Sequence, residues 1–172
     1  MLFSLSKLSA QDSTQYKYNK RGLGVQLGTG LLYGGLGPLF EYQIKYKEKF
    51  RITPLIGIGF SIGGPPDQTD TIHSEGTWIN SAIGANFEYG KKHRLIFGPK
   101  LISAYYTSEI LPASSGQRMF LGYSFIAGYK GTASFGLIWQ VYFGLAHMED
   151  PLMSGKNSYL APNFGLGLGY KF

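Results

Sequence analysis

Apolar and polar residues alternate along most of the chain with a period of two, which is the spacing of side chains on one face of a β-strand. Residues 40–47 are an example, with aromatic or aliphatic residues at even positions and Glu, Gln or Lys at odd positions. This alternation predicts eight strands, over residues 23–33, 40–47, 50–62, 77–89, 94–106, 119–130, 135–146 and 159–172.

The two faces of each predicted strand differ in an unusual way. One face is strongly apolar, whereas the other consists of glycine and polar residues with a few large side chains, namely Trp78, Tyr106, Phe120 and Tyr142. In a soluble sandwich or lipocalin the glycine-rich face would meet water, and few soluble surfaces have that composition. If the apolar face meets lipid, the glycine-rich face lines a narrow closed interior. The pattern therefore predicts an all-β fold, an eight-stranded antiparallel up-and-down transmembrane β-barrel.

The predicted connections alternate in length. Those over 47–49, 90–93 and 131–134 are short, whereas those over 63–76, 107–118 and 147–158 are longer, and 34–38 is an exception. Outer-membrane barrels have short periplasmic turns and longer outer loops. We therefore expect both the N-terminus and the C-terminus to be periplasmic.

Three prolines lie inside predicted strands, at Pro54, Pro99 and Pro162. Proline has no backbone N–H and is rare within β-ladders except at edges and bulges. We expect β-bulges at these positions.

Composition narrows the class of protein further. The chain has 172 residues, which fits one domain, and its 25 Gly and 8 Pro are too many for a helical bundle. The absence of Cys excludes a disulfide scaffold and a Cys-ligated zinc site. Residues 1–10 resemble the back half of a secretory signal peptide with cleavage after Ala10. We expect 11–20 to be a polar N-terminal periplasmic segment and 21–172 to be the barrel.

The chain is basic, with 16 Lys and Arg against 10 Asp and Glu, a net charge of +6. Its basic residues lie at predicted turns and strand ends, where they meet anionic lipid headgroups or pair with Glu41 and Glu88 inside the barrel. This placement argues against nucleic acid as a partner. The charges predicted to face the interior are Glu41, Lys45, Arg51, Glu88, Arg94, Lys100, Lys130 and Lys171.

An aqueous channel is not expected. Eight strands enclose a space just wide enough for side chains, and the inward set includes large apolar residues, namely Leu32, Leu55, Ile96, Ile102, Ile126 and Ile138. We expect a plugged interior, in which the glycines leave room at most for a small apolar pocket that takes a lipid tail.

The C-terminal stretch 163–172 resembles the insertion signal of bacterial outer-membrane proteins, a final strand that ends in Phe with apolar residues at alternate positions. The matching residues are Phe164, Leu166, Leu168, Tyr170 and Phe172. The chain from about 21 to 172 resembles the small outer-membrane barrels of the OmpA, OmpX and OmpW type. With Gln11 after the presumed cleavage site, it is similar to barrels from Bacteroidota. The resemblance implies insertion by the barrel-assembly machinery, with Phe172 and Tyr170 recognised in that step.

Some small barrels are enzymes. The lipid A deacylases of this size use a His with a Ser two residues later and a nearby acid, but His147 is followed by Met148 and Glu149. His73 precedes Ser74 and Glu75 in the wrong order and in a loop, whereas a triad needs a rigid frame. His93 lies in a basic turn. We expect no catalytic residues.

Metal and cofactor sites are also not expected. The weak metal candidates are Asp67, Asp70, His73 and Glu75, whose spacing does not match an EF-hand loop. The glycines form no phosphate-binding loop. Solvated acidic loops are the simpler interpretation, and no cofactor is indicated.

These observations favour a non-enzymatic integral outer-membrane barrel that acts as a structural or accessory subunit of a larger complex with other envelope proteins. Outer-membrane lipid and lipopolysaccharide are expected partners. Two alternatives remain open: a hydrolase or binder of outer-leaflet lipid, and an adhesin that acts through its acidic loops.

Overall fold

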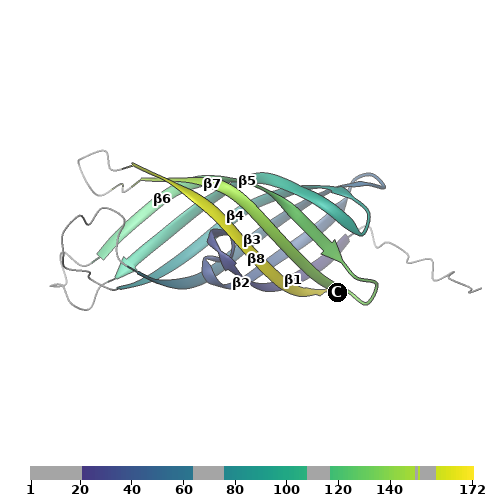
Figure 1. Ribbon diagram of the computed structural model, residues 1–172, viewed down its shortest axis with the longest axis horizontal. Coiled ribbons are helices and arrows are strands. Elements are labelled where there is room, and N and C mark those ends of the chain that lie inside the picture. Colours follow the sequence, from purple (N-terminus) through teal and green to yellow (C-terminus); the bar gives the residue numbers. More distant parts are fainter. Residues whose placement is uncertain (1–20, 64–75, 108–116, 150, 152–157) are drawn as a thin grey trace, which may run out of the picture.

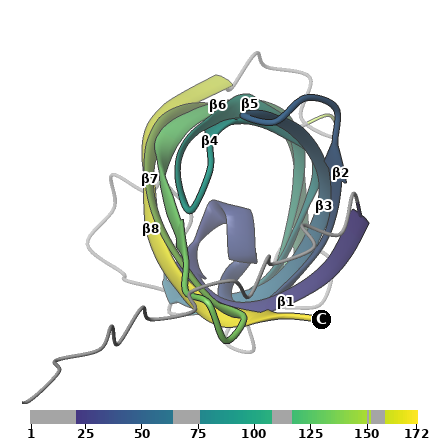
Figure 2. The same cartoon turned by 90° about the vertical axis from the view of Figure 1, so that its right-hand side faces the viewer.

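The computed structural model describes residues 21–63, 76–107, 117–149, 151 and 158–172. Eight strands form one closed antiparallel barrel in which each strand pairs with its neighbours in the sequence and β1 pairs with β8 (Figures 1 and 2). The strands are β1 (Arg21–Gly30), β2 (Gly35–Lys45), β3 (Phe50–Gly63), β4 (Gly76–Gly90), β5 (His93–Thr107), β6 (Gln117–Thr132), β7 (Leu137–Glu149) and β8 (Ser158–Lys171). The predicted fold class is confirmed. The segments 1–10 and 11–20 lie outside the described residues.

The wall follows the predicted alternation. In β7, the outward residues Trp139, Val141, Phe143 and Leu145 are exposed, whereas the alternate residues Gln140, Tyr142, Gly144 and Ala146 are buried in the lumen. The other strands also carry large apolar side chains on the outside, whereas their buried inner face combines charged and polar residues with a smaller set of apolar ones. An outer surface of this kind matches a lipid environment. Among the described residues, no helix is both long enough and apolar enough to span a bilayer.

The expected β-bulges at the strand prolines are wrong for the described strands. The register is constant on both sides of Pro54, Pro99 and Pro162. Instead, Pro54 coincides with an interruption of pairing toward β2 only, and Pro99 with one toward β4 only. Pro162 lies beyond the point at which the pairing of β8 with β1 ends, at Leu166. A missing N–H removes one ladder bond without adding a residue, so the strand keeps its register.

The prediction that one strand spans 23–33 is wrong at its end. β1 ends at Gly30, and residues Leu31–Tyr33 form a short 3₁₀ helix, η1, which folds into the lumen (Figure 2). The backbone N–H of Leu32 donates to the Tyr142 hydroxyl at 3.0 Å, and Asn80 Nδ2 donates to the Gly34 carbonyl at 3.1 Å. These two bonds fix the connection between β1 and β2 as a plug.

The short connections cover 46–49, 91–92 and 133–136, at the end of the barrel that holds the C-terminus; we call it the short-turn end. Glu48 forms an ion pair with Lys91 there, and Gly90 N donates to the Lys49 carbonyl at 2.7 Å. The hydrogen bond from Lys91 lowers the pKa of the exposed Glu48 carboxyl. The opposite end is the one at which β3, β5 and β7 end and β4, β6 and β8 begin.

Candidate functional site in the barrel lumen

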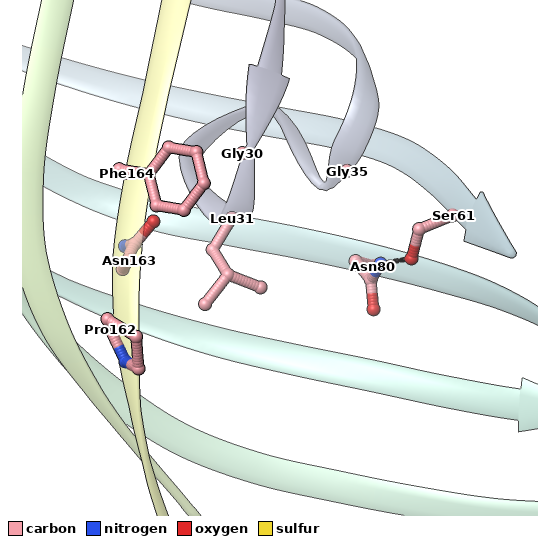
Figure 3. Close-up of a pocket in the computed structure, with 8 residues that line it drawn as sticks. All are labelled: Gly30, Leu31, Gly35, Ser61, Asn80, Pro162, Asn163 and Phe164. Carbon is pink, nitrogen blue, oxygen red and sulfur yellow. Dashed lines mark hydrogen bonds between the residues drawn. The ribbon is translucent and has the colours of Figure 1, made fainter. Parts of the chain in front are cut away.

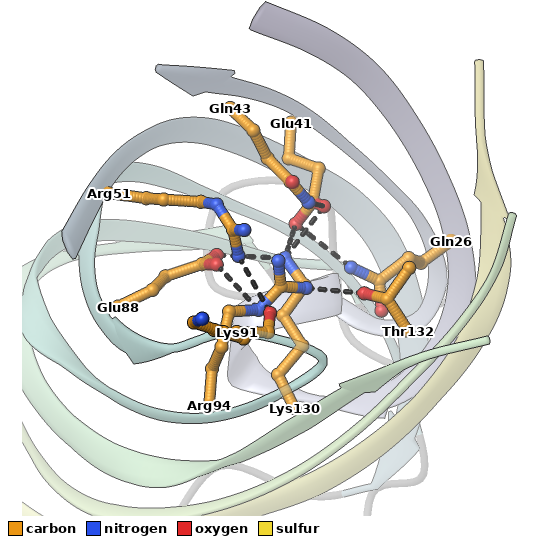
Figure 4. Close-up of polar contacts among 9 residues, drawn as sticks. All are labelled: Gln26, Glu41, Gln43, Arg51, Glu88, Lys91, Arg94, Lys130 and Thr132. Carbon is orange, nitrogen blue, oxygen red and sulfur yellow. Dashed lines mark hydrogen bonds and ion pairs between the residues drawn. The ribbon is translucent and has the colours of Figure 1, made fainter. Parts of the chain in front are cut away.

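Charged side chains meet in the lumen on the side of the short-turn end (Figure 4). Lys130 on β6 reaches Glu41 Oε1 and Oε2 at 2.6 and 2.5 Å, and Glu88 Oε1 at 2.9 Å. Gln26 and Gln43 donate amide hydrogen bonds to the two oxygens of Glu41 at 3.0 and 2.8 Å. All five side chains are buried, so this group ties β6 across the lumen to β1, β2 and β4.

Two arginines extend this group. Arg94 Nε lies 3.1 Å from Glu88 Oε2, and its Nη2 donates to Thr132 Oγ1 at 2.5 Å. Arg51 donates to the carbonyl of Lys91 at 3.1 Å. We call the set of Gln26, Glu41, Gln43, Arg51, Glu88, Arg94 and Lys130 the ionic layer. Three cations and two carboxylates share it, and a charge buried in this way is stable only when it is paired.

The remaining predicted interior charges lie elsewhere. Lys100 is buried and donates to the Ala85 carbonyl at 2.7 Å and to the Pro99 carbonyl at 3.2 Å. The Ala85 carbonyl lies opposite Pro99, and the proline nitrogen has no hydrogen to donate to it. The Lys100 ammonium group supplies that hydrogen bond instead. Lys45 and Lys171 are half-buried at strand ends.

An apolar layer lies next to the ionic layer. Leu32 of η1 packs there with Leu39, Leu55, Ile96, Ile126 and Tyr142, all of them buried. Ala82, Ile102 and Ala146 form a second buried cluster, against which Leu31 packs. Ionic and apolar side chains together fill most of the described lumen, an arrangement that does not fit a water-filled channel.

A cavity of about 230 Å³ remains beside η1 (Figure 3). The cavity is lined by residues of η1 and of the strands around it. They are Gly30, Leu31, Gly35, Ser61, Asn80, Pro162, Asn163 and Phe164. Aromatic side chains lie in the same half of the lumen, with the Trp78 ring centroid 4.8 Å from Tyr106 and 5.4 Å from Phe120.

Sequence reasoning placed none of the cavity residues in a pocket. The polar residues Ser61, Asn80 and Asn163 belong to three different strands, and only the strand register brings them together. The sequence feature that could have indicated this cavity is an Asn at an inward-facing position of a glycine-rich strand. The position of η1 had no such signal.

The histidines form no catalytic group among the described residues. His147 faces outward on β7, where Nε2 lies 3.0 Å from Glu149 Oε1 and the ring packs 5.1 Å from Tyr123. His93 stacks on Tyr129 at 5.9 Å. No three His, Asp or Glu side chains converge as metal ligands within the part of the chain that is described. The metal candidates Asp67, Asp70, His73 and Glu75 lie outside the described residues.

The residues of the C-terminal signal are all exposed: Phe164, Leu166, Leu168 and Tyr170 on the outer face of β8, and Phe172 directly after it. Phe172 N donates to the Leu23 carbonyl at 2.8 Å, so the end of the chain closes the barrel against β1. Their recognition during insertion stays a prediction.

Comparisons with known proteins give the fold. No family model matches the chain, and no curated protein matches it. Among solved structures, the attachment invasion locus protein Ail of Yersinia pestis is similar, with 13% identity, a TM-score of 0.50, and coverage of 88% of this chain and 96% of Ail.

The N-terminal β-barrel domain of Pseudomonas aeruginosa OprF has 14% identity, a TM-score of 0.46 and the same two coverages. At these identities a likeness gives the fold alone. The closed eight-stranded topology, the apolar outer wall and the likeness to Ail agree, and the chain has the fold of the small eight-stranded outer-membrane barrels.

Proposed function

We propose that this protein is a non-enzymatic integral outer-membrane barrel that acts as a structural or accessory subunit of a larger envelope complex, with both termini in the periplasm. The observation that supports this most is the filled lumen. The ionic layer and the plug tie the walls together and leave the outer wall as the main surface through which the molecule can act.

The outer wall carries an aromatic surface near the short-turn end. Phe87 lies 6.4 Å from Phe50 and 5.6 Å from Phe97, measured between ring centroids. Aromatic residues in this position are typical of the membrane interface, so lipid alone accounts for them. They are also the residue type enriched where membrane or soluble proteins contact each other. This surface is therefore our candidate contact for a neighbouring envelope protein.

The proposal is tested by gentle detergent purification of the full chain from its native membrane, followed by identification of co-purifying chains. We expect defined partner proteins at a fixed ratio. The double variant Phe87→Ala, Phe97→Ala should lose them, whereas the matched control Val141→Ala, Phe143→Ala on β7 should retain them. A wild-type protein that runs alone would remove the accessory role.

Of the two alternatives, lipid binding has a specific observation in its favour, the cavity beside η1. Lipid hydrolysis has none among the described residues, because His147 pairs with Glu149 on the outer wall. Mutation of His73 and His147 with analysis of lipid A structure tests hydrolysis directly, and unchanged lipid A would remove it. Adhesion depends on acidic loops outside the described residues and is tested by deleting them.

A further inference from the structure

The barrel wall is incomplete next to η1. Pairing between β8 and β1 ends at Leu166 with Thr29, although β8 pairs with β7 as far as Ser158. Pairing between β2 and β3 ends at Leu36 with Phe60, although β3 continues to Gly63. The chain between β1 and β2 turns inward at this height and forms η1. Within the described residues, β8 and β3 thus border a gap of three strand spacings, about 14 Å.

The edge of β8 at this gap is poorly suited to pairing with another strand. Phe172 N donates toward β1, at Leu23, whereas Lys171 N donates toward β7, at Gly136. Because the register of β8 is constant, its even-numbered residues direct their backbone groups to the β1 side. Pro162 is one of them and has no N–H. A proline on an open edge blocks strand addition.

The borders of the gap are apolar. Leu160 and Phe164 on β8 are 70% and 72% exposed, and Ile62 on β3 is 75% exposed. These side chains continue the outward apolar surface of their strands, so the gap opens toward lipid hydrocarbon. A polar opening to water would have polar borders.

The cavity lies at this gap and is lined by residues from both faces of β8. Pro162 and Phe164 belong to the outward face of β8, whereas Asn163 belongs to its inward face, yet all three line the same space. On the far side it is bounded by Ser61 and Asn80, and Leu31 of η1 lies between the two sides (Figure 3). An apolar chain that enters from the lipid therefore reaches Leu31 inside the lumen.

Asn163 gives the cavity a specific polar requirement. Asn163 is only 3% exposed, and its side-chain Nδ2 donates to Ser124 Oγ at 3.0 Å. Its Oδ1 has no hydrogen-bond partner; Figure 3 draws this oxygen on the side of the ribbon that faces Leu31. A buried acceptor without a donor is costly, so a ligand that donates a hydrogen bond here is favoured.

We propose that this lateral cleft, bordered by β8, β3 and η1, holds one hydrocarbon chain of an outer-leaflet lipid, whose hydroxyl or amide N–H donates to Asn163 Oδ1. The apolar borders and Leu31 accept the methylene groups, and Asn163 selects a chain with a polar donor near its head. A lipid fits better than a polypeptide strand because Pro162 blocks pairing and the space continues into the lumen. This proposal does not depend on the accessory role proposed above.

The test uses the full chain, refolded without native lipid and incubated separately with lipid A, whose acyl chains carry hydroxyl and amide groups, and with a phosphatidylethanolamine that has plain acyl chains. Lipid that survives detergent exchange is counted by native mass spectrometry. We expect equimolar retention, with lipid A preferred about fivefold, the value of one hydrogen bond. Asn163→Leu should remove the preference and keep the binding of both lipids.

Two variants fill the cleft, Leu31→Trp and Ser61→Phe, and either should abolish retention of both lipids. The control Ile58→Trp adds the same bulk on the lipid-facing side of β3 and should behave as wild type. Each variant is first checked for folding by its shift between boiled and unboiled gel samples, and the folded ones are compared. The proposal would be overturned if the wild-type protein retained no lipid, or if all folded variants retained lipid equally. A polypeptide bound in place of lipid on protein from native membranes would also overturn it.

Discussion

Lys130 is the residue on which the ionic layer depends. Its ammonium group contacts both buried carboxylates, Glu41 and Glu88, which come from β2 and β4. The amides of Gln26 and Gln43 donate hydrogen bonds to Glu41, and Arg94 forms an ion pair with Glu88. Each carboxylate therefore has more than one partner, and Lys130 joins the two.

Lys130→Met keeps the length of the side chain and removes its charge. We expect the free energy of unfolding to fall by about 3–5 kcal/mol, because two carboxylates then share a buried site without their common cation. Urea unfolding in detergent micelles measures this loss. Lys92→Met, at an exposed turn position, is the matched control and should unfold as wild type does. An unchanged midpoint for Lys130→Met would show that the ionic layer does not hold the walls together.

Glu48 offers a prediction about pH. Its hydrogen bond from Lys91 lowers its pKa in the folded protein. A carboxyl with a lowered folded pKa contributes stability above its unfolded pKa, and this contribution is lost as the pH falls through the folded pKa. We expect Lys91→Met to raise the pKa of Glu48 toward its ordinary value in a carboxyl NMR titration. Lys92→Met should leave it lowered, and a pKa that stays low without Lys91 would refute the assignment.

At the scale of elements, the alternation of residue types predicted all eight strands, because every strand has one face toward lipid and one toward the lumen. It failed at Leu31–Tyr33, since an apolar side chain inside a plug and one on a lipid-facing strand look alike in sequence. The strand prolines predicted bulges because proline lacks a backbone N–H, but these strands tolerate a lost ladder bond without a bulge. Contacts such as the neighbours of Asn163 depend on the register, which the sequence pattern does not specify.

The plug gives the prediction that belongs to this scale. Gly34 ends η1 with φ of 68°, a left-handed conformation, and a Cβ there would meet the backbone of Gly59 and Asn80. We expect Gly34→Ala to lower the free energy of unfolding by about 1–3 kcal/mol through backbone strain, before the steric clash is added. Urea unfolding measures it, and Ile58→Ala on the exposed side of β3 is the control. Equal stability of Gly34→Ala and wild type would mean that the plug is not fixed as described.

At the scale of the whole molecule, the abundance of aromatic residues beside abundant glycine has one explanation. Large apolar side chains cover the outside of the wall, and glycines leave space inside for Glu41, Tyr142 and η1. A soluble protein with this composition would leave its apolar wall in water. The central claim is therefore that the outward face of every strand meets lipid.

The chain has no native cysteine, so single cysteines can report this orientation residue by residue. We would place spin labels on β7 at the outward positions 141, 143 and 145 and at the inward positions 140, 142 and 144, and reconstitute each labelled protein into bilayers. The collision rate of each label is then measured with oxygen, which concentrates in lipid, and with a nickel complex, which stays in water. The structure predicts high oxygen collision rates at the three odd positions and low rates for both reagents at the three even ones. High nickel accessibility at 141, 143 and 145 would contradict the membrane-spanning barrel.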